Sequence, residues 1–125
     1  MGRSTYVYPK NPITLQDIQD QLQYYQEITT KTGEQLNWNY EQQAFPYDIQ
    51  LKEYEGHQYL LLKGTLDRYN SILIGVIDQP SQNAVQITLP SSAEHGDKGK
   101  ANELAKFFAK KFNGTLQLFN GRLIQ

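Results

Sequence analysis

The stretch Ser91–Lys100 holds the side chains whose types and spacing are best suited to binding chemistry. An imidazole, two glycines and two lysines stand there, immediately before a helical stripe of apolar residues. A helix N-terminus carries unpaired backbone N–H groups and a partial positive charge, so it attracts phosphate or carboxylate groups. We therefore predict a loop at a helix entrance that binds an anion, with a solvated loop as the alternative. The predicted ligands are His95, Gly96, Lys98, Gly99 and Lys100.

This stretch does not have the spacing of a nucleotide-binding loop. A P-loop places four residues between its first glycine and the Gly-Lys pair, and a serine or threonine follows the lysine. Here only Asp97 and Lys98 separate Gly96 from Gly99, and Ala101 follows Lys100. The spacing therefore excludes a P-loop and leaves a generic anion site.

Catalytic groups occur without a catalytic pattern. Ser91, His95 and Asp97 supply a hydroxyl, an imidazole and a carboxylate, but the chain has no Gly-x-Ser-x-Gly elbow to form a nucleophile site. The second histidine, His57, lies in a predicted turn, and neither histidine has the spacing of a metal site. The sequence thus predicts no catalytic residue, no metal site and no cofactor.

Aromatic residues provide a second candidate for binding. The chain has nine tyrosines, and tyrosine suits contact surfaces because its ring buries area while its hydroxyl keeps a hydrogen bond. Tyr24 points away from the apolar stripe of its predicted helix, and Phe45 and Tyr47 flank Pro46. We predict Tyr24, Phe45 and Tyr47 as a partner surface, although aromatic residues are also ordinary in half-buried strands.

Basic residues could form a strip along the last helix. The strip would span Lys98–Lys111, and Arg122 lies near it in the sequence. The net charge of −1 and the poor interleaving of aromatic residues disfavour nucleic acid as a partner. A solvated helix face is the simpler interpretation of these lysines.

Length and composition indicate one folded domain over residues 1–125. A chain of this size with 38% hydrophobic residues can bury its own core. The absence of cysteine excludes disulfides, thiolate chemistry and cysteine-ligated zinc. No apolar run suggests a signal peptide or a membrane span, so we expect a cytoplasmic protein. We also expect a monomer or a homodimer.

The first half of the chain predicts a strand, a helix and a hairpin. A helix begins after Thr14, which forms a capping pattern with Asp17, and Gly33 is its expected end. Alternation of aromatic and polar residues predicts a strand over Gln35–Glu41. A β-hairpin is expected over Tyr47–Lys63.

The second half predicts a sheet with one further helix. Ile72–Ile77 is the most apolar run, and Val85–Leu89 alternates as its antiparallel partner. A helix is expected over Ala101–Phe112, ended by Asn113 and Gly114. The fold class is therefore α+β, with a mainly antiparallel sheet of about six to eight short strands and two amphipathic helices packed on it.

Two blocks resemble a small family of uncharacterised single-domain proteins from Bacillus and related Firmicutes. The first block is Thr14–Tyr47, with Gln21–Thr29 and Ala44-Phe45-Pro46-Tyr47, and the second is Asn102–Arg122, with Phe112-Asn113-Gly114 and Phe119-Asn120-Gly121-Arg122. The resemblance spans nearly the whole chain and implies an α+β fold in a bacterial cytosol. It implies no activity and no functional residue.

These observations favour a non-enzymatic module that binds an unknown protein partner or a small molecule. The alternative is an anion- or nucleic-acid-binding domain that uses the Lys98–Lys111 helix. An enzyme that uses His95 or His57 is the third hypothesis.

Overall fold

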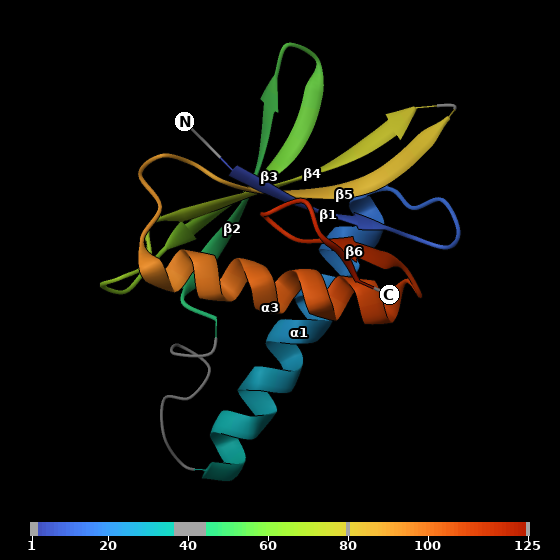
Figure 1. Ribbon diagram of the computed structural model, residues 1–125. Coiled ribbons are helices and arrows are strands. Elements are labelled where there is room, and N and C mark those ends of the chain that lie inside the picture. Colours follow the sequence, from blue (N-terminus) through green and yellow to red (C-terminus); the bar gives the residue numbers. More distant parts are fainter. Residues whose placement is uncertain (1–2, 37–44, 80, 125) are drawn as a thin grey trace.

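The fold is one antiparallel sheet with two helices on the same face (Figure 1). The computed structural model describes residues 3–36, 45–79 and 81–124. The seven strands are arranged in the order β2-β3-β4-β5-β1-β6-β7, which confirms the α+β prediction. In chain order the elements are β1 (Arg3–Tyr8), α1 (Leu15–Leu36), β2 (Tyr47–Tyr54), β3 (His57–Gly64), β4 (Ser71–Gln79), β5 (Gln82–Leu89), α3 (His95–Lys111), β6 (Thr115–Gln117) and β7 (Leu123–Ile124).

The core lies between the sheet and the helices. Alternate strand residues face α3 and the first turns of α1, and each fully buried aliphatic side chain contributes about 1.5–3 kcal/mol. Its largest fully buried members are Val7, Ile18, Leu22, Leu60, Leu62, Ile72, Ile74, Val85, Ile87, Leu104 and Phe108. Among the described residues, neither helix combines the length and apolarity needed to cross a lipid bilayer.

Helix α1 begins where the sequence predicts and ends later. The backbone N–H of Thr14 donates to Asp17 Oδ2 at 2.8 Å, and that of Asp17 donates to Thr14 Oγ1 at 3.3 Å, so the predicted cap is confirmed. The predicted end at Gly33 is wrong, because the helix continues to Leu36. A glycine inside a helix costs only about 1 kcal/mol, which intact neighbouring turns can offset. The predicted strand over Gln35–Glu41 is therefore wrong at its start, and its remainder lies outside the described residues.

Helix α3 begins earlier than the sequence predicts. It starts at His95, so the segment Gly96–Lys100 forms its first turns and is not a loop. The backbone N–H of Glu94 donates to Asp97 Oδ2 at 2.8 Å, which is the contact of a capping box. The end at Asn113 and Gly114 is confirmed, since the Gly114 N–H donates to the Ala109 carbonyl at 2.8 Å.

Two tight hairpins build the central sheet. In the first, Tyr54 pairs with His57 across Glu55 and Gly56, whose φ angles of 51° and 81° are those of a type I′ turn. In the second, Gln79 pairs with Gln82 across residues 80–81. The predicted hairpin over Tyr47–Lys63 and the antiparallel pair of central strands are thus confirmed.

Candidate binding groove between two hairpins

The ladder between β3 and β4 ends before either strand does. Paired residues run from Lys63–Ser71 to Leu60–Ile74, whereas β3 extends to His57 and β4 extends to Gln79. Beyond Leu60 and Ile74 each strand is paired only with its own hairpin partner. Two-stranded ribbons twist more strongly than wide sheets, so the hairpins diverge, as the β2–β3 and β4–β5 arms of Figure 1 show.

The diverging hairpins enclose a groove of about 650 Å³, within the usual size range of ligand sites. Its lining comes from both hairpins and mixes apolar, aromatic and polar side chains. The lining residues are Tyr54, His57, Gln58, Tyr59, Leu73, Ile74, Gly75, Val76, Ile77, Asp78, Gln79, Gln86 and Thr88.

Gly75 keeps the middle of the groove open. A Cβ atom at Gly75 would meet only the Cβ of Tyr59, at 3.9 Å, which is an ordinary van der Waals contact. A side chain at this position would therefore not clash with the protein, and its absence leaves free space at the β4 wall of the groove. On either side of it, Leu73 and Ile77 are half-buried and supply apolar surface.

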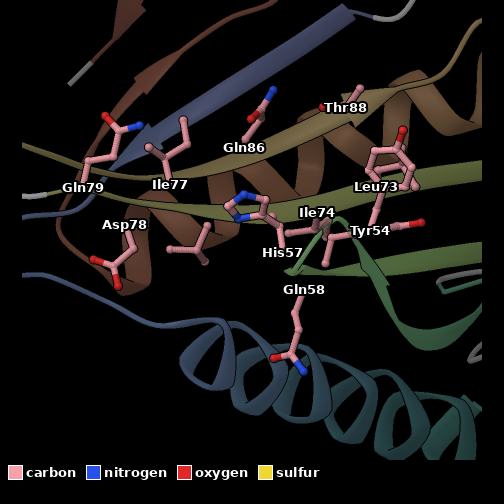
Figure 2. A pocket seen from close by; sticks show the side chains of 13 residues that line it. Tyr54, His57, Gln58, Leu73, Ile74, Ile77, Asp78, Gln79, Gln86 and Thr88 are labelled. Atoms are coloured by element: carbon pink, nitrogen blue, oxygen red, sulfur yellow. The ribbon is translucent and has the colours of Figure 1, made fainter.

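Polar groups line the ends and one wall of the groove. Figure 2 shows the His57 imidazole in the middle of the view, with Asp78 and Gln79 at the end of β4. On the β5 wall, Gln86 Nε2 donates to Ser4 Oγ at 3.2 Å, and Ser4 Oγ and Thr88 Oγ1 share a hydrogen bond of 2.8 Å. These hydrogen bonds hold the Gln86 amide and the Thr88 hydroxyl in place at the surface that a ligand would contact.

Among the described residues, the side chains of the groove are not gathered into a metal site. Within residues 3–36, 45–79 and 81–124, no three histidine, aspartate or glutamate side chains are grouped to hold a metal ion. The groove therefore offers shape, apolar surface and hydrogen-bonding groups.

The predicted anion ligands are split between two places. His95 and Lys98 line a smaller cavity of about 250 Å³, where Arg3 from β1 joins them. Lys100 lies elsewhere and is almost buried, with its Nζ 2.5 Å from Glu103 Oε2. Gly96 packs so closely that an added Cβ would lie 2.5 Å from the Arg68 carbonyl oxygen, so it serves packing.

An internal carboxylate occupies the entrance of α3. Asp97 is fully buried and accepts from the backbone N–H groups of Asn70 at 2.8 Å, Ser71 at 3.3 Å and Glu94 at 2.8 Å. Its other oxygen accepts from the Tyr47 hydroxyl at 2.5 Å. An external anion was predicted at this helix entrance, but the carboxylate of Asp97 lies there. Anion binding beside His95 and Lys98 stays a prediction.

Two of the three residues predicted as a partner surface belong to the core. Phe45 is 6% exposed and Tyr47 is 3% exposed, so this prediction is wrong for both. They join a row of edge-to-face aromatic pairs, Tyr25–Phe45 and Phe45–Tyr47 at 5.7 Å and Tyr47–Tyr69 at 5.6 Å. Tyr24 is 44% exposed, with the ammonium of Lys111 4.5 Å from the centre of its ring.

The predicted basic strip is interrupted. Lys100 is turned inward to Glu103, and Lys111 lies over Tyr24, whereas Lys106 and Lys110 are exposed on α3. Arg122 is exposed beyond β6. A continuous row of free ammonium groups over Lys98–Lys111 is therefore not formed.

The comparisons with known proteins agree with this fold. Residues 5–125 match a family described as a domain of unknown function (DUF1885). The chain belongs to this family. It is also similar to a solved protein of unknown function from Bacillus stearothermophilus, with 42% identity over 92% of this chain and 90% of that chain and a TM-score of 0.62. No curated protein matches the chain. The resemblance proposed from the sequence is thus confirmed.

Sequence reasoning missed the groove, although β4 contains a signal for it. Ile72–Ile77 is apolar on both faces of its strand, which is typical of a strand covered on both sides. Ile72 and Ile74 are buried in the core on the helix side of the sheet, whereas Leu73 and Ile77, on the other face of the strand, are half-buried and line the groove. The signal for the groove is thus the apolar pair Leu73 and Ile77, on a face of β4 that no helix of the described residues covers.

Proposed function

We propose that this protein is a non-enzymatic binding module whose ligand occupies the groove between the β2–β3 and β4–β5 hairpins. The observation that carries the proposal is the early end of the β3–β4 ladder, which opens a groove of about 650 Å³. Ligand sites are typically concave and largely apolar, with a few placed polar groups. The groove has these properties in one place.

The lining supports a ligand with both apolar and polar parts. Leu73, Val76 and Ile77 offer aliphatic surface, and Tyr54, which is 67% exposed, offers an aromatic ring at the rim. Gln86 and Asp78 add hydrogen-bonding groups to the β5 and β4 walls. A planar group with a hydrogen-bond donor fits this combination.

Indole is a suitable probe, because it is planar, apolar and carries one N–H donor. We expect a titration followed by amide NMR shifts to move the resonances of Gly75, Val76 and Ile77. Gly75→Leu should abolish these shifts by filling the groove, and Gly75→Ala should reduce them. Gly99→Leu is the matched control, since Gly99 lies on α3 with no atom within 4 Å of an added Cβ.

Two results would contradict the proposal. One is a wild-type titration in which indole moves no resonance of the groove. The other is a folded Gly75→Leu protein that responds to indole as the wild type does.

Anion binding is the alternative function, and its support is the approach of Arg3 to His95 and Lys98 in one cavity. A phosphate titration at low ionic strength separates it from the groove, because it should move the resonances of Arg3 and Lys98 and leave Gly75 unchanged.

A further inference from the structure

Resting on the proposed function, we infer that the natural occupant of the groove is an extended peptide segment of a partner protein, which adds a strand along the inner edge of β4. The segment runs antiparallel to β4 and carries β-branched residues with a basic residue at its N-terminal end. Backbone pairing supplies the binding, and the groove walls select the side chains.

The hairpin register fixes which backbone groups face the groove. In a hairpin with a two-residue loop, the residues that flank the loop form a hydrogen-bonded pair, and bonding direction then alternates along each strand. Gln79 and Gln82 flank residues 80–81, so Gln79, Ile77 and Gly75 bond to β5. Val76 and Asp78 therefore direct their N–H and C=O groups away from β5, toward β3.

The opposite hairpin follows the same rule. Tyr54 and His57 flank Glu55 and Gly56, so Gln58 directs its backbone groups toward β4. By the same alternation, Leu60 directs its backbone groups toward β4 and Ile74 directs its own toward β3. The two residues are indeed paired with each other, which agrees with this assignment.

The inner edge of β4 has no strand partner beyond this ladder. The register between β3 and β4 stops at Leu60–Ile74, so the backbone groups of Val76 and Asp78 are unpaired with any strand of the described chain. Free strand edges are templates for another strand, which would lie about 4.8 Å away. This edge lies inside a wedge that opens beyond Gly75, where an added Cβ would still lie 3.9 Å from the Cβ of Tyr59, so we expect a single extended segment as its partner and not the edge of another folded sheet.

The charges at the open end of the groove favour a basic segment. Asp78 lies at the end of β4 and is the carboxylate among the lining residues of the groove. No lysine or arginine of the described chain is among these lining residues, so the carboxylate of Asp78 has no ammonium or guanidinium group beside it in the lining. A segment antiparallel to β4 enters the wedge with its N-terminus at this open end, which places a basic residue beside Asp78.

The inference can be tested with the peptide acetyl-Lys-Val-Thr-Val-Thr-amide and the full-length protein. Hydrogen exchange of individual amides is the measurement. At saturating peptide, exchange of the Val76 and Asp78 amides should slow by at least about tenfold, while that of Ile77, already bonded to β5, should not change. This alternation is a signature that general stabilisation of the fold would not produce.

Two variants separate backbone pairing from charge. Asp78→Pro removes the edge N–H without breaking a bond to β5 and should abolish peptide binding. Asp78→Ala keeps the N–H, removes only the carboxylate and should weaken binding by a few fold. Two peptides that are N-methylated at different residues provide a control on the ligand. N-methylation should prevent binding only at residues whose backbone N–H would donate to β4, and not at the residues between them.

The outcomes distinguish this inference from the proposed function. If indole binds in the groove but the peptide protects neither Val76 nor Asp78, the peptide inference is overturned and the binding groove stands. If neither probe binds there, both are overturned. Peptide binding that survives Asp78→Pro, or that protects all β4 amides equally, also overturns strand addition.

Discussion

The Tyr47 hydroxyl donates to Asp97 Oδ1 at 2.5 Å inside the core, and this contact joins β2 to the first turn of α3. Because Asp97 also accepts the N–H groups of Asn70 and Glu94, one buried carboxylate holds three segments of the chain. Buried charge is tolerated only when hydrogen bonds replace the lost water. This cluster therefore ties β2, one strand of the β2–β3 hairpin, to the start of α3.

Removal of the Asp97 carboxylate should strongly destabilise the protein. Asp97→Ala leaves the Tyr47 hydroxyl and several N–H groups without an acceptor, and we expect the free energy of unfolding to fall by about 3 kcal/mol or more. Tyr47→Phe removes one donor and should cost about 1–2 kcal/mol. Urea unfolding measures both. Asp48→Ala, at an exposed position of β2, is the control and should change little; an equal loss there would contradict this account.

Alkaline pH should destabilise the fold through Tyr47. Burial, with the hydrogen bond to Asp97, raises the pKa of Tyr47 far above its ordinary value. The unfolded chain loses this proton near pH 10 while the folded chain keeps it, so the stability is complete below about pH 10 and falls as pH rises above it. The slope reaches at most about 1.4 kcal/mol per pH unit. Melting temperatures of wild type and Tyr47→Phe should converge as pH rises from 9 to 11, and parallel curves would contradict the assignment.

Acid should release the contact between α1 and α3. Burial alone would raise the pKa of Glu103, but hydrogen bonds from Lys100 and Tyr25 and the Lys100 charge together lower it. A lowered pKa stabilises the fold above the unfolded value and the contribution is lost as pH falls through the folded value. An NMR titration should place the Glu103 midpoint below the ordinary value of a glutamate side chain. In Lys100→Met that difference should shrink.

Two neighbouring glycines of α3 should respond in opposite directions. Gly96→Ala introduces a Cβ 2.5 Å from the Arg68 carbonyl oxygen, and we expect a loss of about 1–3 kcal/mol because the helix must shift. Gly99→Ala meets no atom within 4 Å and should gain up to about 1 kcal/mol from helix propensity. Thermal unfolding compares the two directly. Equal effects would show that the close approach of Gly96 to Arg68 has no energetic weight.

Local features of the chain were predictable from residue order alone. Thr14 and Asp17 specify the start of α1, and Asn113 with Gly114 specifies the end of α3, because a cap depends on groups within a few residues. The alternation of Val85–Leu89 and the turn at Glu55 and Gly56 likewise specify strands and a hairpin. The family resemblance, which spans nearly the whole chain, also followed from the sequence.

Other features depended on contacts between distant residues. Gly33 is typical of a helix end, yet α1 continues past it. Phe45 and Tyr47 were predicted on the surface, yet both side chains are buried in the core cluster, which also contains residues of α1 and α3. From the sequence, Asp97 belongs to a segment that could be a solvated loop. Its carboxylate is buried because Tyr47 and Asn70, which are distant in sequence, donate hydrogen bonds to it. The groove itself arises because the β3–β4 ladder ends at Leu60 and Ile74. The sequence by itself determined the elements and their caps, since those follow from local hydrogen bonds and periodicity. Only the tertiary structure decided which charges are buried and where the sheet opens, because these depend on packing between segments far apart in the chain.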